Sequence, residues 1–157
     1  MDESKLVTGT GHHQVRVYDI RTQRRPVIDY NVGEHPINVI LSAPAIGDSV
    51  SAKSNSKNDV CFDYTVISAD TVGNIVFTDL RKEGKVMGKC RGPTGSVRDM
   101  DLCGVGDRAH LASCGLDRYL YIHQLGSKKL ETKFYLKQRL GFVSFVEEPG
   151  KGKEEEE

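Results

Sequence analysis

Apolar and polar residues alternate in short runs along this chain, and three of these runs match one another without gaps. The matching windows begin at Leu6, Val66 and Leu111. Each window opens on apolar positions, continues with a hydroxyl residue and a small residue, and passes through a polar turn into a second alternating run. A period of two over a short run is typical of a β-strand with one buried face, so each window predicts a β-hairpin.

Each predicted hairpin is followed by two further short strands, with a linker containing Gly or Pro between them. The first of these strands cover residues 26–30, 85–90 and 130–135, and the second cover 37–41, 96–102 and 141–146. The repeating unit therefore has four strands. The second and third windows start 45 residues apart, at Val66 and Leu111, which matches the WD period of about 40–45 residues.

The first interval is longer because a polar segment rich in Ser and Asn lies within residues 43–63. This composition predicts a disordered loop between strands. The expected domain therefore covers residues 1–146, with blades around 5–42, 60–102 and 108–146 and a disordered insert at about 43–60. Residues 147–157 are expected to form an acidic disordered tail.

The predicted fold class is all-β, a partial WD40-type propeller of about three antiparallel four-stranded blades. The positions of the WD consensus are degraded, since the closing Trp-Asp pair is replaced in every window and the turn Asp is present only as Asp117. Natural propellers have about 4–8 blades, so we expect the C-terminal part of a larger ring. One way to close a ring is for the strand at 141–146 to pair with the N-terminal strands.

Composition narrows the functional classes. The chain has 157 residues, and its 22 Lys and Arg balance its 22 Asp and Glu, so no overall field attracts nucleic acid or a membrane. No apolar run approaches the roughly 18 residues of a membrane helix, and the first residues lack a secretory-signal pattern. The four cysteines have no zinc-site spacing and are expected to be buried thiols inside the cell.

Two sharper chemical hypotheses are outweighed by simpler ones. Residues 6–11 resemble the start of a glycine-rich nucleotide loop, but Gln14 replaces the third glycine and a strand pattern follows where a helix should begin. His110 and His123 lie near Cys103 and Cys114, but a metal site needs three or four ligands to converge, and adjacent His12 and His13 point apart on a strand or turn. No catalytic constellation appears, so we expect a non-enzymatic protein without cofactor or metal.

Partner-binding candidates lie in the hairpin turns and in the linkers before each first strand. Arg98 and Arg118 are favoured because Arg is enriched among interface anchors, whereas Asp117 has the alternative role of holding its turn. The full candidate set is His12, His13, Arg21, Arg81, Arg98, Asp117 and Arg118.

Arg21 and Arg81 belong to Asp-x-Arg sequences similar to boxes that recruit propellers to cullin-type ubiquitin ligases. The alternative is a local ion pair between the Asp and the Arg. Two basic stretches, at 16–25 and 128–139, could contact RNA phosphates or form a solvated rim.

Several residues outside the WD consensus carry a more specific resemblance. The window from Leu6 to Asp19 with Gln23-Arg-Arg-Pro-Val27, together with Cys114-Gly-Leu-Asp-Arg118, is similar to the WD repeat-containing protein 74 family. This resemblance implies a nucleolar scaffold of large (60S) ribosomal subunit biogenesis and rRNA processing. It implies binding to pre-60S assembly factors and ribosomal proteins, a link to a nucleolar AAA ATPase, possible pre-rRNA phosphate contacts and no membrane.

Overall fold

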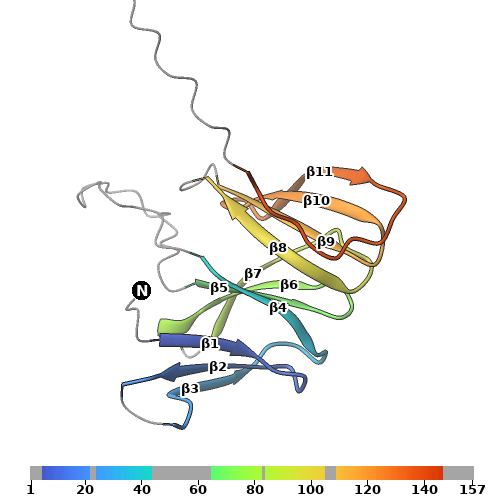
Figure 1. The fold of residues 1–157 in the computed structure, drawn as a ribbon. Helices are drawn as coiled ribbons and strands as arrows, with labels where there is room; N and C mark the ends of the chain where they lie inside the picture. The colour runs from blue at the N-terminus through green and yellow to red at the C-terminus, as the bar shows by residue number, and fades with distance from the viewer. Residues whose placement is uncertain (1–4, 22–23, 44–64, 83, 105–108, 147–157) are drawn as a thin grey trace, which may run out of the picture.

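The computed structural model describes residues 5–21, 24–43, 65–82, 84–104 and 109–146. Within these ranges the chain forms three antiparallel sheets of three or four strands, stacked face to face (Figure 1). The predicted all-β class is confirmed. One short 3-10 helix, η1 (Leu80–Lys82), is the single helical segment of the described residues, and no helix there is long and apolar enough to cross a membrane.

The strands follow the sequence in simple meanders. The first sheet has the order β1-β2-β3, the middle sheet β4-β5-β6-β7 and the third sheet β11-β10-β9-β8. The first sheet contains β1 (Lys5–Gly9), β2 (Gln14–Asp19) and β3 (Ile28–Asn31). The middle sheet contains β4 (Ile37–Ser42), β5 (Thr65–Asp70), β6 (Ile75–Asp79) and β7 (Lys85–Cys90). The third sheet contains β8 (Val97–Cys103), β9 (His110–Gly115), β10 (Tyr119–Gln124) and β11 (Lys129–Tyr135).

Each four-stranded sheet begins with the strand that closes the preceding sequence unit. Strand β4 pairs with β5, with Leu41 opposite Ile67, and β8 pairs with β9 in the same way. Strands β4 and β8 are each the first strand of their sheet in chain order and lie at its edge, and the two strands contact each other. In the first sheet, β1 occupies the position of β5 and β9 but pairs only with β2.

The core consists of two apolar layers on either side of the middle sheet. Because side chains alternate along a strand, β5 directs Ile67 into the layer shared with the third sheet and Val66 into the layer shared with the first. Phe77 and Val76 of β6 divide in the same way. Both faces of the middle sheet are therefore buried, and every residue of β5 and β6 is buried.

The strand predicted at 141–146 is not formed. These residues have no strand partner, and Phe142 and Val146 are 91% and 88% exposed. Side-chain carboxylates hold the segment instead, since the backbone N–H of Val143 donates to Asp99 and that of Phe145 to Asp101. The predicted pairing with the N-terminal strands is also absent, because the middle sheet separates the two ends of the stack (Figure 1).

The predicted insert at 43–60 lies outside the described residues except for Ala43. That residue continues the sheet, since its N–H donates to the carbonyl of Thr65 at 3.0 Å and its side chain is buried. The predicted insert thus overlaps the described sheet at Ala43, and its remaining residues stay a prediction. The predicted tail at 147–157 also lies outside the described residues.

Candidate functional site: a partner-binding surface

The hairpin turns and the linkers meet at one end of the stacked sheets. We call this the turn-and-linker face; it comprises turns 10–13, 71–74 and 116–118, linkers 33–36, 91–96 and 136–140, and the bulged residues Asn38 and Arg98 at the starts of β4 and β8. Backbone hydrogen bonds join the two kinds of segment, from Thr71 N to Pro36 O and from Leu116 N to Ser96 O, both at 3.1 Å. Figure 1 shows the turns on the same side of the molecule, where β4 and β8 begin.

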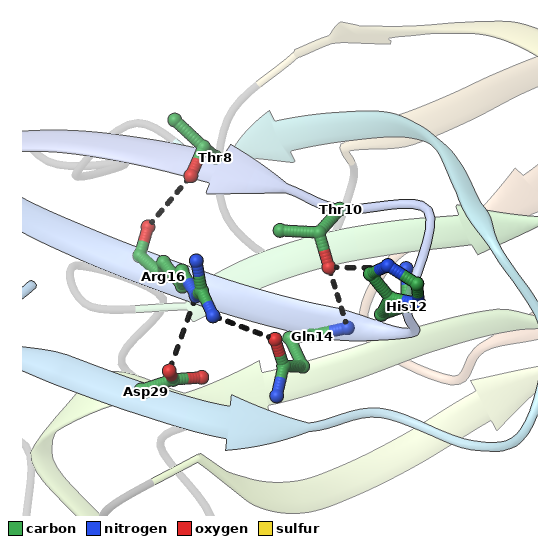
Figure 2. Close-up of polar contacts among 6 residues, drawn as sticks. All are labelled: Thr8, Thr10, His12, Gln14, Arg16 and Asp29. Carbon is green, nitrogen blue, oxygen red and sulfur yellow. Dashed lines mark hydrogen bonds and ion pairs between the residues drawn. The ribbon is translucent and has the colours of Figure 1, made fainter.

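The first turn presents His12 and His13 on this face. Figure 2 shows the hydroxyl of Thr10 accepting hydrogen bonds from the backbone N–H groups of His12 and Gln14, at 3.3 and 3.1 Å. His13 adopts a left-handed conformation with φ 54°, which the tight turn requires. As a result the His12 side chain is exposed and His13 is half-buried.

In strand β2, which follows this turn, the Arg16 side chain contacts other residues of the first sheet. Its Nε lies 3.1 Å from Asp29 of β3, and its guanidinium also donates to Gln14 at 2.9 Å (Figure 2). This basic residue therefore bridges two strands of the first sheet.

Asp117 joins the third turn to the preceding linker. Its carboxylate accepts the hydroxyl of Tyr121 at 2.7 Å, the backbone N–H of Tyr119 at 3.2 Å and that of Thr94 at 3.3 Å. Burial raises the pKa of Tyr121, and the carboxylate of Asp117 raises it further, so the tyrosine stays a hydrogen-bond donor. These contacts match the turn-holding role considered as the alternative for Asp117.

Arg98 and Arg118 lie exposed on the same face, each through a backbone irregularity. Arg98 occupies a β-bulge between Val97 and Asp99, and bulges redirect the side chain of the extra residue. Arg118 has φ 69°, and its carbonyl accepts the N–H of Leu136 at 2.9 Å, which leaves the side chain outside the turn.

An equivalent bulge in β4, between Ile37 and Val39, places Asn38 between two sheets. Its side-chain amide donates to the hydroxyl of Ser96 at 2.7 Å and to the carbonyl of Val97 at 3.0 Å. Asn38 therefore fixes the middle sheet to the third at the turn-and-linker face. The sequence pattern did not reveal this link, because a bulge depends on strand pairing.

Arg21 and Arg81 lie at the opposite end of the strands. Asp79 is 2% exposed and accepts the guanidinium of Arg81 at 3.2 and 3.1 Å, an arrangement that lowers the pKa of the carboxyl. In the first Asp-x-Arg sequence the backbone N–H of Arg21 donates to Asp19 at 3.0 Å. The alternative interpretation of these sequences was a local ion pair between the Asp and the Arg. The second sequence forms such a pair, between Asp79 and Arg81.

Parts of both Asp-x-Arg sequences line one small pocket. A cavity of about 180 Å³ lies between the first and middle sheets, with Asp19 contributed by one sequence and Arg81 by the other. The other lining residues are Lys5, Val17, Val27, Ile28 and Leu80. The candidate residues therefore form two groups at opposite ends of the strands, not one site.

Sequence reasoning missed Asp70. Its carboxylate accepts the backbone N–H groups of Val72, Gly73 and Asn74 at 2.8–2.9 Å, and the Asn74 amide at 2.6 Å. Burial raises its pKa, but these hydrogen bonds outweigh burial and lower the pKa overall. The WD consensus has its turn acid at the position of Val72, whereas here an Asp that begins the turn closes it.

The prediction of buried thiols is confirmed for Cys90 and Cys114 but not for Cys103. Burial raises the pKa of Cys90 to about 12 and that of Cys114 to about 11, as expected for buried thiols. Cys103 is exposed, so the prediction is wrong there, because β8 ends at this residue; Cys61 lies outside the described residues. His123 is fully buried, with Nε2 3.1 Å from the Arg91 carbonyl, and no three ligand-type side chains converge in the described ranges.

These features define a class of protein: partial WD40-type propeller blades that present a polar turn-and-linker face. No protein-family model matches the chain. WD repeat-containing protein 74 of Bos taurus is 40% identical over 141 residues, which is 88% of this chain and 31% of the relative. The Homo sapiens protein of the same name is 41% identical over 138 residues, covering 87% of this chain and 31% of its own length.

More distant relatives carry a functional name. Ribosome biogenesis protein NSA1 of Meyerozyma guilliermondii is 29% identical over 154 residues, which is 91% of this chain and 36% of that protein. The chain is therefore a homologue of the WD repeat-containing protein 74 and NSA1 family, as its non-consensus residues predicted. It spans about a third of the length of these relatives.

Proposed function

We propose that this chain acts as a non-enzymatic protein-binding scaffold in ribosome biogenesis. The observation that carries the proposal is its similarity, along about nine-tenths of its length, to a protein named for ribosome biogenesis. The finer part of the proposal is a role in large-subunit (60S) assembly and rRNA processing, in the nucleolus of the nucleus. Its expected partners are pre-60S assembly factors and ribosomal proteins, with a nucleolar AAA ATPase acting on the complex.

The turn-and-linker face supplies the binding chemistry. Arg98 and Arg118 are exposed guanidinium groups, and His12 adds a third exposed polar group on this face. A guanidinium presents a planar fork that pairs with carboxylates or phosphates in two hydrogen bonds. We therefore propose an acidic protein surface as the partner, with pre-rRNA phosphates as the competing source of the same contacts.

A charge-reversal pair tests this proposal. Arg98→Glu with Arg118→Glu should abolish co-sedimentation of the chain with large-subunit precursors, while the far-ultraviolet circular dichroism stays unchanged. The matched control is Lys82→Glu with Lys85→Glu, which makes the same charge change at two exposed residues beside the β6–β7 connection, at the opposite end of the strands. Equal co-sedimentation of both variants and the parent chain would remove this face from the proposal. Ribonuclease treatment separates protein from RNA partners.

The pocket between the two Asp-x-Arg sequences supports a second candidate, a substrate receptor of a cullin-type ubiquitin ligase. Arg81 already pairs with Asp79, which makes Arg21 the more available anchor. An affinity pull-down distinguishes the two functions. Cullin adaptors that are captured by the parent chain and lost on Arg21→Ala support the second, whereas ribosomal proteins and assembly factors support the first.

A further inference from the structure

Linker 91–96 joins the middle sheet to the third and forms part of the turn-and-linker face. Two side chains of the third sheet hold it. The Asp117 carboxylate accepts the N–H of Thr94 at 3.3 Å, and Nε2 of His123 lies 3.1 Å from the carbonyl of Arg91. The attachment to His123 is the deeper one, since this residue is 0% exposed whereas Asp117 is half-buried.

His123 lies on the face of β10 that meets the middle sheet, because its cross-strand partner Leu111 belongs to the apolar layer between the two sheets. Its ring stacks on that of Tyr121, with the centroids 6.3 Å apart. The linker passes close to both rings, since a Cβ added at Gly92 would lie 3.3 Å from the Tyr121 ring and 3.5 Å from Nε2 of His123. The imidazole is therefore enclosed by two neighbouring sheets and the linker that joins them.

Only one of the two ring nitrogens of His123 has a hydrogen-bond partner among the described residues. A carbonyl can only accept, so Nε2 carries the proton and donates to Arg91, which leaves Nδ1 as the acceptor atom of a neutral ring. Nδ1 has no partner there, and neither has the buried hydroxyl of Ser113, on the same face of the neighbouring strand. A second proton would enter at Nδ1, where none of the described residues accepts it.

Titratable or charged groups surround this ring on all but one of the elements packed against it, since β9 presents only uncharged side chains on this face. They are Arg91 of the linker, Cys90 of β7, Asp117 and Tyr121 of the third sheet, and Lys128 of the β10–β11 connection. Burial raises the pKa of Cys90 and of Tyr121, so both are neutral. The Asp117 carboxylate is engaged by Tyr121 and by backbone N–H groups, and the other two groups are cations. Burial therefore lowers the pKa of His123, and the Arg91 carbonyl offsets this effect only in part.

We propose that His123 is an acid-sensitive latch on linker 91–96: a protonated ring leaves the interface between the middle and third sheets for water and releases the linker. The driving force is the cost of a buried charge that has no partner. The linker leads directly into the start of β8, where Arg98 lies, so its release alters the turn-and-linker face. The latch goes beyond the proposed function, because it is a property of this chain alone and is the same for any partner.

The lowered pKa of the enclosed ring sets the pH range of the latch. With the linker released, the ring is in water and has the ordinary histidine pKa of about 6.5, so the open state binds the proton more readily than the closed one. Above that pH the latch is complete. Below it, the equilibrium constant for opening rises by up to about tenfold per pH unit, until the pH reaches the pKa of the closed state.

Hydrogen exchange of single backbone amides, followed by NMR on the full chain from about pH 7.5 to about pH 5, tests the latch. The N–H of Leu116 reports on the linker, because it donates to the carbonyl of Ser96 at 3.1 Å. The N–H of Thr71 is the matched control, because it donates at the same distance to Pro36 in the linker before the middle sheet. The protection factor, which corrects for the intrinsic pH dependence of exchange, should fall for Leu116 by up to about tenfold per pH unit below pH 6.5 and stay constant for Thr71. A constant value for Leu116, or an equal fall for both amides, overturns the proposal.

A variant separates His123 from the other histidines. His123→Gln keeps a side-chain N–H that can donate to the Arg91 carbonyl but does not titrate, so Leu116 should stay equally protected throughout the pH range. The control His35→Gln removes the half-buried histidine of linker 33–36 and should keep the full pH dependence. A pH dependence that survives His123→Gln, or that disappears in His35→Gln, contradicts the latch.

The ring of the parent chain provides a test that needs no variant, should His123→Gln fail to fold. Its two nitrogen resonances distinguish the neutral Nε2–H form from the cation. We expect the neutral form at neutral pH and a midpoint of protonation below about 6.5. A His123 ring that is already charged at neutral pH overturns the proposal.

Discussion

The middle and third sheets are built from the same repeating pattern but differ sharply in burial. All five residues of β6 are buried, whereas in the equivalent strand of the third sheet, β10, only Tyr121 and His123 are buried. The middle sheet has a neighbour on both faces, while the third has one on a single face. The hydrophobic pattern of a blade therefore determines which residues are available for burial, and the adjacent blades determine which of them are buried.

Equivalent positions at the ends of the third strands show a second contrast, between the first sheet and the other two. Each repeat ends its third strand with an acidic or amide residue followed by an aliphatic residue, and the three aliphatic residues are Ile20, Leu80 and Leu125. Leu125 and Leu80 are 0% and 8% exposed, but Ile20 is 72% exposed. Since the free energy of burial scales with the apolar area removed from water, the same motif contributes unequally to stability.

The largest expected effect comes from the middle sheet. Phe77→Ala should lower the free energy of unfolding by about 3–5 kcal/mol, because it leaves a cavity in a fully buried layer. Phe134→Ala makes the same chemical change at a residue that is 48% exposed in β11, and should cost about 1 kcal/mol or less. Urea denaturation of both variants and of the parent chain measures the two losses. Equal losses would show that the two sheets do not differ as described.

The next effect compares the equivalent aliphatic positions. Leu80→Ala should destabilise the chain by about 2–3 kcal/mol, because Leu80 packs in the layer between the first and middle sheets. Ile20→Ala should change the stability by about 0.5 kcal/mol or less, since most of that side chain is already in water. Thermal unfolding followed by circular dichroism measures both. A large loss for Ile20→Ala would indicate that another surface covers the first sheet.

The smallest expected effect concerns the turn of the middle sheet and its pH dependence. Hydrogen bonds lower the pKa of Asp70 in the folded state, so its contribution is complete above the unfolded pKa of about 3.9. That contribution is lost as the pH falls through the folded pKa. Asp70→Asn should cost about 1–2 kcal/mol at neutral pH and weaken the loss of stability on acidification. The exposed pair of Arg16 with Asp29 offers the control, as Asp29→Asn should change little.

Much of this architecture was predictable from local pattern. The hairpins at β1–β2, β5–β6 and β9–β10 lie where the alternating windows placed them, because a strand with one buried face imposes a period of two. The incorrect prediction of a strand at 141–146 also has a physical cause. Residues 141–146 carry the apolar pattern of a strand, but no strand of the described residues pairs with them, and the side chains of Asp99 and Asp101 accept two of their backbone N–H groups instead.

Some features of the candidate surface could also be assigned from the sequence, and others could not. The turn positions of His12, His13, Asp117 and Arg118 could be assigned from sequence because turns fall between strands. The bulge that exposes Arg98, the pairing of Arg81 with Asp79 and the shared pocket depend on contacts between segments far apart in the chain. No local pattern encodes these contacts.

The sequence by itself determined the all-β class, the four-strand repeat, the resemblance to WD repeat-containing protein 74 and the end of the strands at which the turns lie. These properties follow from residue periodicity and from individual non-consensus residues, both of which are local. Only the tertiary structure decided that β4 and β8 begin their sheets, that the middle sheet is buried on both faces, and that residues 142–146 form no strand. Burial and strand pairing are relations between segments, and they are defined only once the sheets are stacked.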